Sequence, residues 1–367
     1  MNNCYQSRDR ECRHEFECAP LGSGILPILF YQSRFTTANI LKKLLVICLK
    51  LVLSFSLLFW LYDSDALDLD AFQKLEFNSR TVQLLGLNAI LLFIGAILLS
   101  LRMWRLLNLL SFDVSIKEAI RVNLASMCLG LMLPGLVGVD AIRATYFCLK
   151  TKDRKADAFT CILTDRIIGV YALMLLATIA AGIGILTDFQ SVHNAFAYIS
   201  GVTLFTFTVI LALICNKQLL ENSPLSIIYK RLPSLLHQII EAIQKIAGYR
   251  RDVGLCLLIS VVSHSITIIN FVIIGILIND NLPALAHFIL NPIALFFNSV
   301  PITPGGLGIT ESVFAYLYES ANSNNGALIS LMGRLNQYCV YIVIGLPAFF
   351  LLKFNFVAPD LDWRQEN

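Results

Sequence analysis

Charged residues are scarce in this sequence: Asp, Glu, Lys and Arg make up 14% of its 367 residues, whereas a typical soluble domain carries about 25%. The scarcity excludes a large soluble domain, and a mean hydropathy of +0.70 indicates that most of the chain lies in lipid. Motifs of several enzyme classes are also missing, namely a nucleotide-binding loop, a GxSxG elbow, an HExxH pair and a CxxC site. We therefore expect no enzyme activity, no cofactor, no bound metal and no ATP-driven pumping. No extended basic groove suggests a nucleic-acid partner.

The ten cysteines are scattered and do not predict a disulfide framework. Most of them lie inside apolar runs, where a thiol behaves as a small hydrophobic side chain. Cys4, Cys12, His14 and Cys18 lie close enough in sequence to ligate a metal, but their spacing fits no standard zinc pattern. We interpret residues 1–43 as a cytoplasmic N-terminal tail without a cleaved signal peptide, and the role of its cysteines stays open.

Six apolar runs have the length of a membrane-crossing helix, which needs about 20 residues. They are 44–62, 82–101, 157–183, 196–215, 253–278 and 327–352. Two more apolar stretches, 119–150 and 284–320, are interrupted by Pro and Gly, and we interpret each as a hairpin that enters and leaves by the same face. The predicted fold class is an all-α polytopic membrane protein with about six full transmembrane helices and two re-entrant broken-helix hairpins.

Lys and Arg are distributed unevenly between the predicted loops. They gather in the N-terminal tail, in 102–156 and in 216–252, while 184–195 and 279–326 contain neither residue. Because positively charged loops stay in the cytoplasm, we predict a multi-pass protein of the cell inner (cytoplasmic) membrane with both termini cytoplasmic.

The predicted transmembrane domain, 44–352, divides into two halves of the same plan, about 44–183 and 196–352, and 353–367 follow as a cytoplasmic C-terminal tail. Each half has two crossings, a hairpin and a third crossing. Because three crossings are an odd number, the second half must be inverted relative to the first. Inverted repeats with interrupted hydrophobic segments in matching positions are typical of transporters.

Both hairpins break at a motif that combines a Pro-Gly pair with further glycines before an acidic residue. The motif residues are Pro134, Gly135 and Gly138 in the first hairpin and Pro304, Gly305, Gly306 and Gly308 in the second. Pro removes a helical hydrogen-bond donor, and Gly permits unusual backbone angles. Backbone groups freed in this way cannot face lipid. We therefore expect the two breaks to line a cavity near mid-membrane, where exposed amides could bind an anion.

Four segments together resemble one known family: LRMWRLLNLL (101–110), NLASMCLGLMLPGLVGVDAIRATYFCLK (123–150), LTDRIIGVYALML (163–175) and SVPITPGGLGITESVFAYLY (299–318). It is the flippase-like family that includes the transmembrane region of lysylphosphatidylglycerol synthase, and the resemblance covers most of 44–352. Its most specific element is PGGLGITE. The resemblance implies a flippase-like transmembrane domain with re-entrant helices that moves lipids, such as aminoacylated phospholipids, between leaflets.

Some relatives in this family are linked to isoprenoid-carried glycans or hopanoids. The present sequence departs from the full-length synthase after residue 352, where a short polar segment is all that follows. We therefore expect no aminoacyl-transfer domain, and no synthesis of the modified lipid by this chain.

Ionisable residues within membrane segments cost about 2.5–3.5 kcal/mol each on insertion scales and are functional candidates for that reason. Six of them form the candidate substrate-binding set: Asp140, Arg143, Asp165, Arg166, Glu311 and Arg334. Our hypothesis is that the arginines bind a lipid phosphate, since guanidinium pairs bidentately with phosphate oxygens. The acids would balance those charges or contact a cationic headgroup. The alternative, which stays open, is that Asp165–Arg166 and Glu311–Arg334 are structural pairs.

Two secondary predictions concern other polar positions. His264 lies on an apolar run, where a hydrogen-bonded packing histidine is more common than a proton relay. The segments 102–112 and 219–247 are amphipathic with a basic polar face, which predicts that they lie along the cytoplasmic interface.

The favoured function is a lipid translocase that passes a phospholipid or lipid-linked headgroup through a midplane cavity. Two alternatives remain: an accessory or catalytic subunit of lipid-linked glycan synthesis, and a secondary transporter of a soluble metabolite. The expected partners are membrane lipids and a separately encoded lipid-modifying enzyme, with oligomer formation left open. The identity of the lipid, the direction of transport and its energy source are not specified by these patterns.

Overall fold

A computed structural model describes residues 52, 55–63, 78–131, 137–150, 154–186, 194–222, 229, 233–298, 303 and 306–352 of the chain. Within this part the secondary structure is entirely helical, without a strand. Residues 55–63 are helical, and from residue 79 onward the bounds of eleven helices are defined. They are α4 (Ser79–Leu109), α5 (Ile116–Gly130), α6 (Val137–Lys150), α7 (Lys155–Leu186), α8 (Asn194–Cys215), α9 (Lys217–Asn222), α11 (Ser234–Gly248), α12 (Arg250–Leu277), α13 (Ala284–Asn298), α14 (Ile309–Glu319) and α15 (Gly326–Leu351).

Four of these helices are long and apolar enough to cross a membrane: α4, α7, α12 and α15. They contain the predicted crossings 82–101 and 157–183 and nearly all of 253–278 and 327–352, so these four predictions are confirmed as apolar helices of spanning length. The predicted crossing 196–215 lies within α8, whose apolar segment Ser200–Cys215 is shorter. Most of 44–62 falls outside the described residues. The chain is therefore an α-helical protein with several helices suited to a multi-pass membrane arrangement.

Local sequence explains where two of the helices begin. Asn78 precedes α4 in an extended conformation, and its side chain accepts a hydrogen bond from the Thr81 backbone N–H at 2.9 Å. Ser115 does the same for α5 through the Glu118 N–H at 3.2 Å. Such caps satisfy backbone donors that have no partner within the first turn of a helix.

The interface-lying segment predicted at 102–112 is wrong in part, because α4 continues without a break to Leu109. Met103, Leu106 and Leu107 are completely buried and belong to a core cluster that also includes Phe147. This apolar stripe recurs every three to four residues and holds the end of α4 in the helix bundle. Arg102 is consequently buried too, with 5% of its surface exposed.

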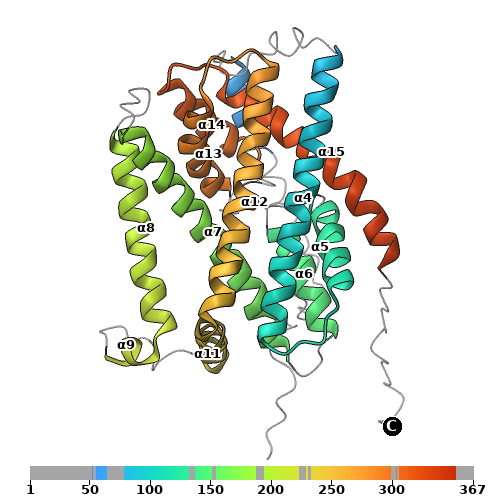
Figure 1. Cartoon of the computed structure of the whole chain (residues 1–367), viewed down its shortest axis with the longest axis vertical. Helices are drawn as coiled ribbons and strands as arrows, with labels where there is room; N and C mark the ends of the chain where they lie inside the picture. The colour runs from blue at the N-terminus through green and yellow to red at the C-terminus, as the bar shows by residue number, and fades with distance from the viewer. Residues whose placement is uncertain are drawn as a thin grey trace, which may run out of the picture. The chain divides into compact units, whose positions relative to one another are not determined.

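Helices from the beginning and the end of the chain pack against one another (Figure 1). Helix α4 lies along α12, α5 packs on α15, and α7 packs on α13. Helix α6 contacts α5 and α7, and α14 contacts α13 and α15. The described helices therefore form one bundle in which helices of the two halves of the sequence pack directly on one another.

Two short antiparallel helix pairs occupy the predicted hairpin regions. In the first pair, Lys150 at the end of α6 binds Glu118 in the first turn of α5, with Nζ–Oε distances of 2.6 and 2.7 Å. In the second pair, Tyr318 near the end of α14 bonds His287 near the start of α13, at 2.7 Å between the hydroxyl and Nδ1. In each pair, a side-chain bond thus joins the start of the first helix to the end of the second helix. The residues between α5 and α6, 132–136, lie outside the described part, as do most of those between α13 and α14.

Close packing of α5 on α15 depends on Gly345. A Cβ atom added at this position would lie 2.5 Å from both the Leu124 carbonyl oxygen and the Cys128 Cβ. We expect Gly345→Ala to destabilise the protein by about 1–3 kcal/mol, since an overpacked interior must shift backbone atoms. The measurement is the thermal unfolding midpoint in lipid nanodiscs.

Gly182→Ala on α7 is the matched control, because no atom of the described residues lies within 4 Å of its added Cβ. Its midpoint should stay the same or rise, since Ala is favoured over Gly inside a helix by up to about 1 kcal/mol. Equal midpoints for the two variants would show that α5 and α15 leave enough space at Gly345 for a methyl group.

Candidate functional site

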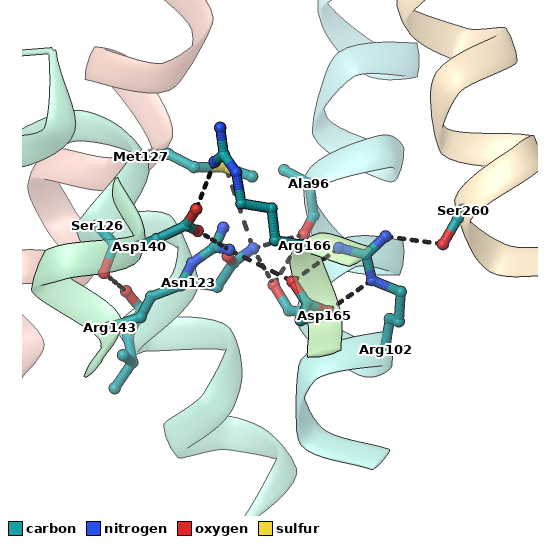
Figure 2. Close-up of polar contacts among 12 residues, drawn as sticks. Ala96, Arg102, Asn123, Ser126, Met127, Asp140, Arg143, Asp165, Arg166 and Ser260 are labelled. Carbon is teal, nitrogen blue, oxygen red and sulfur yellow. Dashed lines mark hydrogen bonds and ion pairs between the residues drawn. The ribbon is translucent and has the colours of Figure 1, made fainter. Parts of the chain in front are cut away.

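A buried ion pair joins α4 to α7. The guanidinium of Arg102 donates from Nε to Asp165 Oδ1 at 2.6 Å and from Nη2 to Oδ2 at 2.7 Å, so the pair is bidentate. Its two side chains are 6% and 3% exposed. Arg102 Nη1 also donates to Ser260 Oγ on α12 at 2.7 Å. One arginine thereby links three of the four helices of spanning length (Figure 2).

Helix α6 brings further charges to this pair. Arg143 Nη1 lies 3.3 Å from Asp140 Oδ1 and 3.6 Å from Asp165 Oδ2. Arg166, on α7, contacts Asp140 Oδ2 at 2.5 Å. Within the described part of the chain, three guanidiniums and two carboxylates form this charged network, and their charges sum to +1. Figure 2 shows the guanidiniums gathered around the two carboxylates.

The network is more accessible at one end than at the other. The side chains of Asp140 and Arg166 are 20% and 29% exposed, while those of Arg143 and Asp165 are 7% and 3% exposed. Arg143 Nε is buried and has no hydrogen-bond partner within the described residues. A buried donor of this kind costs free energy until a partner is supplied.

The second glycine motif ends in a capping arrangement at the start of α14. Gly306 and Gly308 have φ angles of +72° and +84°, a region that L-residues with a side chain rarely adopt. Glu311 Oε2 accepts a hydrogen bond from the Gly308 N–H at 2.7 Å. Its Oε1 lies 3.1 Å from Arg334 Nη2 on α15 and accepts a hydrogen bond from Ser330 Oγ at 3.3 Å. The motif therefore buries an acid that closes its own helix start and binds the neighbouring helix.

The six predicted charged residues thus fall into two groups. Asp140, Arg143, Asp165 and Arg166 share one network, and Glu311 pairs with Arg334. The alternative pairing of Asp165 with Arg166 is not what the geometry shows: the carboxylate binds Arg102, and Arg166 binds Asp140. Neighbouring residues on a helix point in different directions, which separates them.

The predicted glycine and proline positions are only partly described. Gly138 is buried in the first turn of α6, and Gly306 and Gly308 precede α14. Pro134, Gly135, Pro304 and Gly305 lie outside the described residues, as does the N-terminal group Cys4, Cys12, His14 and Cys18.

Sequence reasoning missed Arg102 as a member of the network, and with it Ser260. Arg102 directly follows the apolar run 82–101 and was grouped with a predicted interface segment. The signal that could have found it is the helical spacing of Met103, Leu106 and Leu107, which continues the run.

A central pocket of about 250 Å³ lies between helices of both halves. Its lining comes from α4, α5, α6, α7, α12, α13, α14 and α15. Arg334 is the charged residue among the described lining residues, and the remaining polar positions carry hydroxyl, amide or imidazole groups. Ser263, 3% exposed, has a hydroxyl without a hydrogen-bond partner in the described part of the chain.

His264 lies next to Ser263 and also lines this pocket. Its Nε2 is 3.0 Å from the Gly169 carbonyl oxygen on α7, so it makes the kind of helix-to-helix hydrogen bond predicted for a packing histidine. Gly169 itself lies against Arg102, because a Cβ there would be 3.3 Å from Arg102 Nη1. The pocket wall and the charged network are thus close neighbours across α7.

Comparison with known proteins gives a family and one distant relative. The family model described as "Lysylphosphatidylglycerol synthase TM region" matches residues 47–345. The UPF0104 membrane protein MJ1595 of Methanocaldococcus jannaschii is 22% identical over 320 residues, which cover 83% of this chain and 94% of the relative. No solved structure was found to match.

The buried pair Arg102–Asp165 generates a stability prediction. Replacing Asp165 alone by Leu should cost about 3–5 kcal/mol, because the guanidinium of Arg102 is left buried without its partner. Arg102→Met alone should cost a similar amount. The double variant Arg102→Met/Asp165→Leu should recover much of the loss, and the thermal midpoint in nanodiscs measures all three.

The control is Arg105→Met, which removes the more exposed pair with Asp252, whose side chains are 40% and 25% exposed. Such a pair contributes about 0–1 kcal/mol, so this variant should unfold close to the unchanged protein. A double variant less stable than both single variants would mean that the pair itself, rather than an isolated charge, determines stability.

Proposed function

The chain belongs to the family of the lysylphosphatidylglycerol synthase TM region, and we propose on this basis that it is a lipid translocase without enzyme activity. In this proposal a phospholipid or lipid-linked headgroup passes between leaflets through the central pocket, while the acyl chains stay in lipid. The observation that carries the proposal is a central pocket, bordered by all four helices of spanning length, in which Arg334 and several hydroxyl and amide groups lie among apolar side chains.

The polar interior of this bundle is expensive for a membrane protein. Each ionised group placed in the hydrocarbon region costs about 2.5–3.5 kcal/mol on insertion scales. The chain nevertheless places Arg102, Arg143, Asp165, Glu311 and Arg334 in buried positions. Packing alone does not require these groups, since apolar side chains of similar volume can replace a buried ion pair with little loss. A polar pathway for a lipid headgroup would account for the presence of these buried ionised groups.

The size of the pocket favours a headgroup over a whole lipid. Its volume of about 250 Å³ lies below the range of about 300–1,000 Å³ that is usual for sites enclosing a drug-sized ligand. Two acyl chains would not fit. The proposal therefore keeps the chains outside the bundle and admits only the polar end of the lipid.

We further propose six crossings, two re-entrant hairpins and an inverted repeat. The helix contacts support it: exchanging α4 with α12, α5 with α13, α6 with α14 and α7 with α15 maps the observed neighbours onto one another. Under this exchange α5–α15 becomes α13–α7, α6–α7 becomes α14–α15, and α4–α12 becomes itself. The side-chain bonds that join the start of the first helix to the end of the second helix in each antiparallel pair support the hairpins.

For the setting of the protein, we propose the cell inner membrane with both termini in the cytoplasm. The uneven distribution of Lys and Arg supports this orientation. The proposed partners are membrane lipids and a separately encoded enzyme that modifies the transported lipid.

Orientation can be tested with single cysteines. Asn324→Cys, in the α14–α15 loop, should react with a membrane-impermeant maleimide in intact cells, since both Asn324 and Asn222 are exposed. Asn222→Cys, at the end of α9, should react only after the membrane is opened. The unsubstituted protein measures the background from its own cysteines, and the opposite labelling pattern would reverse the proposed orientation.

The transport proposal predicts that filling the pocket stops lipid movement. Ser263→Leu should lower the rate at least tenfold in proteoliposomes that carry acyl-labelled phospholipids, because the larger side chain occupies the headgroup pathway. The rate is measured by chemical quenching of the outer leaflet.

Ser265→Leu is the matched control, since it makes the same change on the same helix at a position that does not line the pocket. It should transport within twofold of the unsubstituted protein. If the unsubstituted protein moves lipid no faster than empty liposomes do, the translocase proposal fails.

A further inference from the structure

The charge carried by the described residues that line the central pocket is of one sign. No described lining residue carries a carboxylate, and Arg334 carries the positive charge. The other polar positions include Ser263, Thr267, Asn298 and Gln337, whose hydroxyl and amide groups are neutral. A ligand in this pocket would meet hydrogen-bonding groups and a guanidinium, but no negative partner from these residues.

The carboxylates near the pocket are already engaged. Both oxygens of Glu311 have partners, the Gly308 N–H on one side and Arg334 with Ser330 on the other. Both oxygens of Asp165 accept from Arg102.

Asp140 is placed similarly, since its two oxygens contact different arginines, Arg143 and Arg166 (Figure 2). A cationic headgroup would therefore have to displace an existing guanidinium from a buried or half-buried pair. Burying an ammonium without a negative partner is strongly unfavourable.

The surrounding charges instead favour an anion. The arginines at 102, 143, 166 and 334 outnumber the acids at 140, 165 and 311 by one, so the two groups together carry a net charge of +1. A phosphodiester carries one negative charge and would balance this excess. Ser263 Oγ adds a buried hydroxyl that has no partner among the described residues and can bond a polar group of the ligand.

We infer that the pocket selects a headgroup made of a phosphodiester and neutral hydroxyls, and excludes headgroups that carry an ammonium. Phosphoglycerol and phosphate-linked sugars have this chemistry, whereas ethanolamine, choline and lysyl esters do not. The inference rests on the proposed translocase function and specifies its substrate class. The inference also means that the substrate of this chain differs from lysylphosphatidylglycerol, the aminoacylated lipid for which the family is named.

The experiment compares lipids with the same acyl label and different headgroups in proteoliposomes. Phosphatidylglycerol should move at least tenfold faster than phosphatidylethanolamine, phosphatidylcholine or lysyl-phosphatidylglycerol. A phosphate-linked sugar lipid, tested in parallel, distinguishes the two sources of the shared chemistry: whichever moves faster identifies the preferred hydroxyl-bearing group.

Gln337 offers a sharp charge test, because it lines the pocket and donates to the Tyr341 hydroxyl at 2.8 Å. Gln337→Glu adds a carboxylate of nearly the same shape and should reduce the preference for phosphatidylglycerol over the ammonium headgroups at least fivefold. Gln337→Met keeps the size without the charge, and its preference should stay near that of the unsubstituted protein.

The outcomes separate this inference from the proposed function. Equal transport of all headgroups, or faster transport of the ammonium lipids, overturns the charge selection while the translocase proposal stands. An equal shift in Gln337→Glu and Gln337→Met also overturns it, since shape would then be responsible. Absence of transport for every lipid overturns both.

Discussion

Lipid offers no partner to a charge or a free backbone amide, so polar groups within the candidate spans must find partners inside the protein. The bidentate pair of Arg102 with Asp165 is the clearest result of this constraint. Its guanidinium also reaches Ser260, so α4, α7 and α12 share one set of hydrogen bonds. Arg143 and Arg166 extend the same set to α6 through Asp140. The position of the first antiparallel pair against the long helices follows from this network.

The same constraint explains the glycine motif before α14. A helix that begins inside the bundle has backbone donors without partners, and Glu311 accepts from one of them at Gly308. The left-handed backbone at Gly306 and Gly308 makes room for that geometry. Arg334 then balances the buried acid from α15. Helix start, acid and arginine act together, so a role for Glu311 in binding a ligand would be additional to a structural one.

In our proposal, function depends on the net charge that remains after the arginines and the acids have paired. Among the described residues the acids are engaged by arginines, one positive charge remains in excess, and the central pocket with Arg334 in its lining lies next to it. The buried polar network thereby holds the bundle together and sets the sign of charge that the pocket accepts. In a family named for a cationic lipid, this balance is a reason to expect different substrates among its members.

The sequence alone determined the helical class, the four long apolar helices and the two interrupted segments, because lipid burial requires runs whose length and composition are visible locally. It also identified the charged residues of the site other than Arg102, since ionisable groups stand out in apolar runs. Their partners were decided only by the tertiary structure. Asp165 pairs with Arg102, 63 positions away in the chain, instead of with its neighbour Arg166. Helix packing brings such distant side chains together, and no local pattern in the sequence records that distance.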